Sequence, residues 1–455
     1  MMRRLCAGAL CGAFAAFVFE ARAQEPVPQQ AFVAPSAPVA IAEPAPVAEA
    51  VAEPVAAQGA APDGWLTTAE KPSPIYMRWL ESLFDLVAPG EPYRRDKLVL
   101  SLGMSLGYDT NVFYSAINPI ASAVTGVNAS ADYHFGSRRV QLDANLSGGV
   151  NYYQNRPGGS NDDNFALTLA LGYQLMPRLK LSFTTNTSYL SQPEPQLIGG
   201  IFQYGGSYFY TDTRLDLNYQ MRPRFGLALG YDYNALKYDD EVINQGSGFY
   251  QQTFSLSGNF LVSPRTTLTL QYRYNPVSYY ESGIGSTGQF LLVGIEQTLS
   301  PRLKYTFMFG SEYRSLENPA PDSPSSYLGP FAEGSLNYNF APRSLLTGSM
   351  RLGTEPSGTS GVTIRQTFRS SLGVTHYIGG RLSVNGSIAF EHDLYDQPGI
   401  DDFSQDIYST SVSLSYQLAY YTSIVLRDDY IVVEGSTPNS SYSRNFSSIG
   451  LQITF

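Results

Sequence analysis

Charged side chains that alternate with apolar ones along predicted strands are the residues of this sequence best placed to act on a solute. In a strand that is apolar on one side, they lie on the other side and point into the interior of a closed sheet. Charges of both signs on neighbouring strands either pair along the wall or form a transverse field that selects solutes, and both alternatives stay open. The candidates for lining a channel are Arg273, Glu296, Lys304, Glu312, Arg351, Arg365, Arg369, Glu391 and Asp393.

Patterns that mark enzymes elsewhere lack their structural context here. Gly103–Gly107 has the spacing of a nucleophile elbow around Ser105, but that motif needs a sharp strand-to-helix turn, and no helix is predicted after this strand. Gly283–Gly288 matches a dinucleotide fingerprint in its letters alone, because it falls in a loop between two strands. We therefore predict no catalytic residue, no cofactor and no metal site. A barrel protease or lipase stays an alternative, since such sites are assembled from distant strands. The three histidines that such a site could use are far apart in the sequence: His134, His376 and His392.

The composition favours one way of positioning these side chains. The chain has 455 residues with 15% charged, 13% aromatic, 33 Tyr and 41 Gly, and it contains no apolar run of the length, about 18 residues or more, that a membrane-spanning helix needs. So many aromatic residues also exclude disorder of the whole chain. Few charges with abundant Tyr and Gly are typical of a transmembrane β-barrel, whose strands are only half apolar.

The first residues predict export. Met1–Ala23 has a basic start, an apolar stretch and a small-residue cleavage site, as in a secretory signal peptide. Both cysteines, Cys6 and Cys11, lie inside it, so the mature chain would have no thiol. Removing three Arg and one Glu changes the formal charge from −10 to −12, and an acidic exported chain is a poor candidate for binding nucleic acid.

Two further segments precede the predicted barrel, which spans residues 96–455. Residues 24–63 are rich in Ala and Pro and predict a disordered linker. Residues 64–95 predict a periplasmic segment with a short amphipathic helix over Pro74–Ala88, and both tryptophans, Trp65 and Trp79, fall in this segment. The helix either packs on the periplasmic end of the barrel, or docks a partner or occludes the pore.

A tight turn recurs between long alternating segments, with a period of 37 to 46 residues. A propeller blade of this period would need four short strands, whereas each period here holds two long ones, so the pattern indicates hairpins joined by longer loops. The turns are Gly136–Arg138, Met176–Arg178, Arg222–Arg224, Ser263–Arg265, Ser300–Arg302, Ala341–Arg343, Gly379–Arg381 and, less typically, Ala419–Tyr421.

Counting turns predicts an all-β, antiparallel up-and-down barrel of about 18 strands, with 16 as the fallback if the last turn is absent. Short turns alternate with long polar connections: Gln154–Asp163, Asp239–Gly248, Leu316–Ser326 and Gln397–Asp406. In outer-membrane barrels the short turns face the periplasm, so we expect this chain in the cell outer membrane of a Gram-negative organism, in contact with lipid and lipopolysaccharide.

The last strand and the end of the first strand of the predicted barrel carry recognisable sequence motifs. The last strand alternates to Phe455, which looks like the C-terminal signal read by the barrel assembly machinery. Gly107-Tyr-Asp-Thr-Asn-Val-Phe113 resembles the Gly-Tyr-Asp-Ser-Asn-Val pattern of the β-barrel porin 2 family, with Thr110 in place of the usual Ser. The resemblance implies an 18-stranded porin of the kind found with exopolysaccharide gene clusters, working beside a polysaccharide export partner in the periplasm. It carries over no functional residue.

These observations predict an outer-membrane channel, with exopolysaccharide export as the sharper form of that function. A non-conducting structural barrel that anchors a periplasmic partner is the main alternative, and a general solute porin lies between the two.

Overall fold

The computed structural model describes residues 97–157, 161–191, 207–239, 248–280, 285–317, 325–356, 364–395, 403–437 and 440–455. The predicted signal peptide (1–23), linker (24–63) and periplasmic segment with its helix (64–95) lie outside the described residues, as does the beginning of the glycine-rich stretch at 283. Among the described residues, no helix is long and apolar enough to cross a membrane.

The described chain forms 18 strands, each 12 to 17 residues long. They are β1 (Lys97–Asp109), β2 (Ser122–Gly136), β3 (Val140–Tyr153), β4 (Asn161–Met176), β5 (Leu179–Leu190), β6 (Tyr208–Arg222), β7 (Phe225–Tyr238), β8 (Phe249–Ser263), β9 (Thr266–Tyr279), β10 (Gly285–Ser300), β11 (Leu303–Glu317), β12 (Ser326–Ala341), β13 (Ser344–Pro356), β14 (Ile364–Ile378), β15 (Leu382–Tyr395), β16 (Phe403–Ala419), β17 (Thr422–Gly435) and β18 (Tyr442–Thr454).

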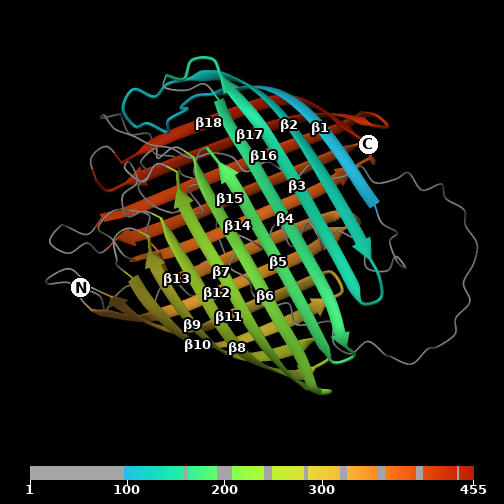
Figure 1. The fold of residues 1–455 in the computed structure, drawn as a ribbon, viewed down its shortest axis with the longest axis vertical. Helices are drawn as coiled ribbons and strands as arrows, with labels where there is room; N and C mark the ends of the chain where they lie inside the picture. The colour runs from blue at the N-terminus through green and yellow to red at the C-terminus, as the bar shows by residue number, and fades with distance from the viewer. Residues whose placement is uncertain are drawn as a thin grey trace, which may run out of the picture.

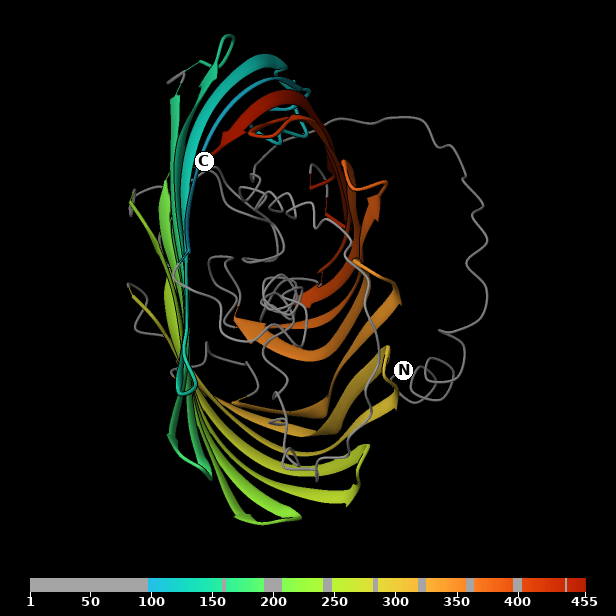
Figure 2. The same ribbon diagram turned by 90° about the vertical axis from the view of Figure 1, so that its right-hand side faces the viewer.

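Every strand pairs antiparallel with its sequence neighbours, and β1 pairs with β18 to close the sheet. Figure 1 shows the strands side by side around the barrel, and Figure 2 shows that blue-green and orange strands form facing walls. The weak turn predicted at Ala419–Tyr421 is present, because β16 ends at Ala419 and β17 begins at Thr422. The predicted 18 strands are therefore confirmed, and the fallback of 16 is wrong.

The short turns are built alike, which explains their repetition in the sequence. In six of the eight hairpins the register shifts by one residue just before the turn, as between Gln174 and Met176. Such a bulge bends the strand into a tight connection. The backbone carbonyl of the turn Arg then accepts a hydrogen bond from the next hairpin, as from Gln220 N to Arg178 O at 2.8 Å. Tyr421 takes the same role in the eighth turn, with Thr454 N at 2.8 Å.

Several strands reach further into the long connections than the sequence indicated. Strand β4 already begins at Asn161, β11 extends to Glu317 and β16 begins at Phe403. The predicted loops at these places are therefore shorter than expected. Beyond the apolar band both faces of a strand are polar, so the alternation of apolar and polar residues no longer marks where the strand ends. We call this end of the barrel the long-loop end and the opposite one the short-turn end.

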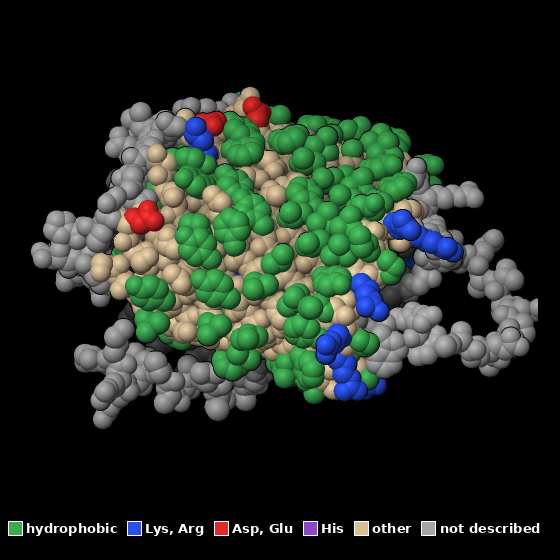
Figure 3. Space-filling model, turned by 60° about the horizontal axis from the view of Figure 1, so that its bottom comes forward, with side chains coloured by type: hydrophobic (Ala, Val, Ile, Leu, Met, Phe, Trp, Pro, Cys, Tyr) green, Lys and Arg blue, Asp and Glu red, His purple; other side chains and the backbone are tan. Residues whose placement is uncertain are grey.

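The outer face of the barrel is apolar, as the alternation predicts. In β1, Leu98 and Met104 are 59% and 64% exposed, whereas Val99 and Ser101 on the other face are only 6% and 5% exposed. Figure 3 shows apolar side chains covering the visible face of the barrel between its two ends. Large exposed apolar side chains all along the strands are expected of a surface that faces lipid.

Candidate solute site in the lumen

Contacts between strands that are not neighbours identify the concave face of the barrel. Arg273 on β9 forms an ion pair with Glu333 on β12, although β10 and β11 lie between these strands. Adjacent strands are about 4.8 Å apart, so such a contact closes only where side chains converge, on the inside of the curved sheet. Residues in register with this pair therefore point into the lumen.

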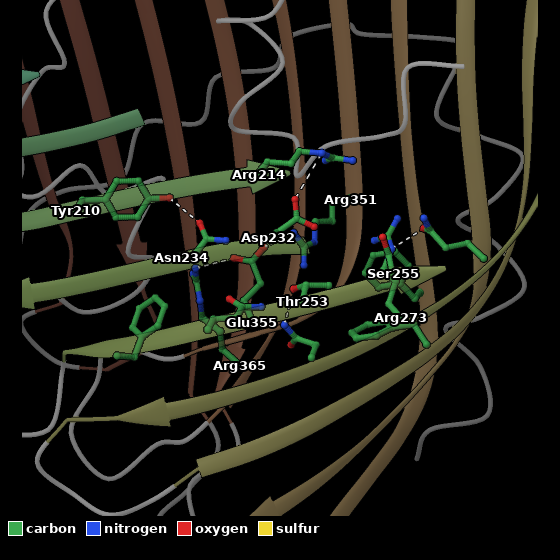
Figure 4. Close-up of a pocket in the computed structure, with 16 residues that line it drawn as sticks. Tyr210, Arg214, Asp232, Asn234, Thr253, Ser255, Arg273, Arg351, Glu355 and Arg365 are labelled. Carbon is green, nitrogen blue, oxygen red and sulfur yellow. Dashed lines mark hydrogen bonds and ion pairs between the residues drawn. The ribbon is translucent and has the colours of Figure 1, made fainter. Parts of the chain in front are cut away.

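A cavity lies on this inner face, between β6–β9 and the strands from β10 to β14. The space between these strands measures about 890 Å³ with the open solvent included, and Figure 4 shows arginine, carboxylate and amide side chains converging on it. Its lining combines charged groups, amides, hydroxyls and aromatic rings: Tyr210, Arg214, Asp232, Asn234, Phe249, Gln251, Thr253, Ser255, Gln271, Arg273, Asn275, Phe290, Phe331, Arg351, Glu355 and Arg365.

One side of the cavity is a network of charges from β13, β14 and β15. Arg365 contacts Glu391 at 2.8 Å and Glu355 at 3.0 Å, and it also pairs with Asp393. Arg369 contacts Glu391 at 2.5 Å and Glu355 at 3.1 Å. All five side chains are at least 90% buried. Each charge therefore has partners of opposite sign, without which its burial would cost several kcal/mol.

Arg351 extends this network towards the open space. Its guanidinium lies 3.4 Å from Glu355, a carboxylate that Arg365 and Arg369 already share. It also lies over the ring of Phe331, 5.5 Å from the centroid. Its Nε has no hydrogen-bond partner among the described residues. Arg351 is thus the most weakly paired arginine in this network.

A second network holds β11 against its neighbours. Arg314 is 2.9 Å from Glu312, and its Nε donates to Thr354 Oγ1 at 2.8 Å. Thr354 N in turn donates to Glu312 Oε2 at 3.0 Å. The ladder between β12 and β13 is described only as far as Ala332 and Leu352 towards the long-loop end, so the Glu312 carboxylate satisfies a β13 amide beyond that ladder. The charges of Arg314 and Glu312 therefore stabilise the contact between β11 and β13.

The facing side of the cavity comes from β6 and β7. Arg214 Nε is 2.6 Å from Asp216 and 3.5 Å from Asp232. Tyr210 donates to Asn234 Oδ1 at 3.2 Å. Both walls thus present guanidinium and carboxylate groups together with neutral donors and acceptors, so the cavity combines hydrogen bonding with charge.

The structure places the nine sequence candidates on the inner face, but in different settings. Arg273, Arg351 and Arg365 line the cavity. Glu296 and Lys304 pair with each other at 3.3 Å, nearer the short-turn end. The other four belong to the two networks just described: Glu312, Arg369, Glu391 and Asp393. That they line a conducting pore stays a prediction.

Sequence reasoning missed several partners of these candidates. Glu333, Glu355 and Arg314 were absent from the set, although the register places Glu333 opposite Arg351 and Glu355 opposite Arg365. The alternation of side chains between the two faces of β11, β12 and β13 would have found them. The same alternation could not identify the apolar residues on the inner face, because every apolar residue was assigned to the lipid-facing side. Examples are the cluster of Phe290, Leu292, Met308 and Phe331.

The enzyme-like patterns lie in strands. Ser105 is in the middle of β1, and Gly285–Gly288 begins β10. Each histidine contacts one neighbouring-strand side chain at 2.6 Å: His134 contacts Asp143, His376 contacts Ser344 and His392 contacts Asp406. Among the described residues, no carboxylate forms a hydrogen bond with the Ser344–His376 pair. The pair therefore lacks the third residue of a catalytic triad there.

The 107–113 motif has a clear structural position. Asp109, on β1, accepts hydrogen bonds from Arg444 on β18 at 2.6 to 3.0 Å, and both side chains are buried. Asn111 donates to the carbonyls of Ser115 and Ser443 at 2.8 and 3.0 Å. Arg444 also lies over the ring of Tyr114 at 4.2 Å. The motif therefore fastens the first long loop to the junction where the barrel closes.

A closed sheet of 18 antiparallel strands, apolar outside and charged inside, defines a transmembrane β-barrel of the outer-membrane, porin-like type, and its place is the cell outer membrane. The sequence matches no protein-family model and no curated protein, so the resemblance to the β-barrel porin 2 family stays a prediction.

Among solved structures, the chain is similar to three proteins of Pseudomonas aeruginosa. OccK2 (OpdF) in complex with glucuronate is 12% identical, with 79% of this chain and 98% of that chain covered and a TM-score of 0.43. OpdK with vanillate is 11% identical, with 79% and 99% covered and a TM-score of 0.41. The siderophore receptor PirA is 11% identical, with 80% and 81% covered and a TM-score of 0.36. The class rests on this chain's own barrel.

Proposed function

We propose that this chain is a passive channel of the outer membrane, with its short-turn end in the periplasm, and that it acts as a conduit and not as an enzyme. A barrel of about 18 strands is too wide for its own side chains to fill. The observation that carries the proposal is the cavity on the inner face, because it brings hydrogen-bonding and charged groups from opposite walls to one place.

The solute class that fits this lining best is a saccharide. Amides such as Asn234 and Gln251 present donors and acceptors for hydroxyl groups, and rings such as Phe290 and Phe331 offer faces on which the C–H side of a sugar packs. This supports the sharper proposal that exopolysaccharide passes outward through the barrel, delivered by an export partner in the periplasm.

Purified full-length protein in a planar bilayer tests the saccharide proposal. Neutral and acidic oligosaccharides added to one side should interrupt the ionic current in a concentration-dependent way. Replacing two cavity amides (Asn234→Ala with Gln251→Ala) should weaken that block several-fold, since a buried hydrogen-bonding site loses affinity when its polar groups are removed. A current that no saccharide affects would instead identify a general solute porin.

Export is tested in cells. Deleting the gene should trap polysaccharide in the periplasm and remove it from the surface, and the wild-type gene should restore it. Unchanged surface polymer would reject export. If the protein carries no current at all, the remaining candidate is the structural barrel that anchors a periplasmic partner.

We also propose that Phe455 is read by the barrel assembly machinery. Its backbone exchanges hydrogen bonds with Leu100 at 2.7 and 3.2 Å, and its side chain is 62% exposed at the short-turn end. Phe455→Ala should lower the amount of folded barrel in cells, while folding of the purified chain into lipid vesicles stays within about two-fold. Tyr421→Ala, which removes the ring beside Phe455, is the matched control. Equal loss in both variants would point to packing alone.

A further inference from the structure

Arginine is concentrated in the short turns of the barrel. Seven of the eight turns carry it, and none contains Asp or Glu. We call this set the arginine rim: Arg138, Arg139, Arg178, Arg222, Arg224, Arg265, Arg302, Arg343 and Arg381. Figure 3 shows most of the visible Lys and Arg side chains at this end, and the visible Asp and Glu side chains, with some basic atoms beside them, at the opposite end. The lumen networks use none of these arginines.

The fold holds the backbone of the rim and leaves its side chains exposed. The carbonyls of Arg178, Arg224, Arg265, Arg302 and Arg381 accept hydrogen bonds of 2.8 to 2.9 Å from the adjacent hairpin. All of these residues are exposed. The repeated turn therefore presents these arginines on a hydrogen-bonded backbone along the short-turn end.

Five arginines of the rim have no acidic partner among the described residues. Among the described residues, the side chains of Arg178, Arg224, Arg265, Arg302 and Arg343 form no ion pair, in contrast to the arginines of the lumen, each of which has a carboxylate partner. An exposed cation that evolved for pairing within the fold would have an acidic neighbour in the turn or on the next hairpin. The described residues therefore supply no counterion for these five arginines.

The arrangement of the rim decides between a protein partner and a lipid surface. Successive turns are two strands apart, which places their arginines about 10 Å apart or slightly more around the circumference. A globular partner covers an arc of such a ring, whereas a membrane leaflet surrounds all of it. The rim also borders the apolar outer band, where long basic side chains place their methylene stems on apolar surface and their charge among headgroups.

We propose that the arginine rim binds the headgroups of anionic phospholipids in the leaflet at the short-turn end. The guanidinium groups contact lipid phosphates, fix the depth of the barrel and enrich anionic lipid around it. This interaction is independent of whether the lumen conducts, so it stands or falls separately from the channel proposal.

Native mass spectrometry of the full folded chain, taken from mixed micelles of phosphatidylglycerol and phosphatidylcholine, tests this. The wild type should retain phosphatidylglycerol preferentially. The variant with Arg178→Gln, Arg224→Gln, Arg302→Gln and Arg343→Gln should lose roughly ten-fold or more of that preference, because each basic side chain at an anionic surface contributes roughly five-fold. The same four changes to Lys keep the charge and should keep the preference, and Lys237→Gln at the long-loop end should not alter it.

If the fourfold variant does not fold, Arg302→Gln alone should give a smaller loss of the same sign. A preference that the Gln variants leave unchanged would overturn the proposal. So would complete displacement of the lipid by inorganic phosphate at equal phosphate concentration, which would identify a site for free anions. Binding of polygalacturonate to the rim, with no lipid preference, would assign the surface to acidic polymers instead.

Discussion

Single carboxylates set the charge that the cavity presents. Glu355 is shared by Arg351, Arg365 and Arg369, so its neutralisation leaves three guanidinium groups with one partner fewer. Glu355→Gln should therefore move the selectivity of the channel towards anions, and Arg351→Gln should move it towards cations. The reversal potential in a salt gradient measures both. Glu434→Gln makes the same change outside the cavity lining and should leave the potential unchanged, and an equal shift in that control would contradict this account of the cavity.

The pair of Asp109 and Arg444 is the second prediction at this scale. Arg444→Leu leaves Asp109, which is fully buried, without its cation. Breaking such a pair costs about 3–5 kcal/mol of unfolding free energy. Adding Asp109→Asn removes the buried charge and should recover part of the loss. Urea unfolding in lipid vesicles measures the unfolding free energies of the wild type, the two single variants and the double variant. If the loss in the double variant equals the sum of the losses in the two single variants, the residues do not act as a pair.

The alternation of side chains along each strand explains which lumen residues could be predicted from the sequence and which contacts could not. The alternation of side chains with a period of two placed Arg273, Arg351 and the other candidates on the inner side of their strands. It could not join Arg273 to Glu333, since that contact depends on how strongly the sheet curves across two intervening strands. It also could not show that Glu312 bonds a backbone amide of β13, because nothing in the sequence marks where a ladder ends.

At the scale of elements, the junction of β11, β12 and β13 depends on that carboxylate. Glu312→Leu should leave Arg314, which is 1% exposed, without its carboxylate partner and the Thr354 amide without its acceptor. We expect a loss of about 3–5 kcal/mol in unfolding free energy and faster hydrogen exchange at Thr354. Exchange measured by mass spectrometry on peptides of β13 checks this, with peptides of β3 as the internal reference. Uniformly faster exchange in both would indicate general destabilisation and contradict a local role.

The hairpins were predictable because their signal is local. Six of the eight short turns have Pro or Gly followed directly by Arg, and the structure adds a bulge at six of the eight. The long-loop ends of β4 and β16 were set too short, because polar residues on both faces of a strand look like a loop. The predicted number of strands was still correct, because it depends on the number of turns and not on the lengths of the strands.

For the whole molecule, the closure of β1 on β18 converts 18 half-apolar strands into a shell with one lipid face and one interior face. The sequence contained the count, the alternation and the terminal strands, so this shell was predictable. The cavity was not, because its lining combines residues of eight strands, β6–β10 and β12–β14, whose distance across the lumen depends on the cross-section of the barrel.

Single-channel recording of the purified full-length protein in a planar bilayer tests the central claim most directly. The account predicts discrete, reproducible current steps whose ion selectivity moves towards anions in Glu355→Gln and towards cations in Arg351→Gln. The absence of any current, even after deletion of residues 24–90, would contradict the claim that this barrel is a channel.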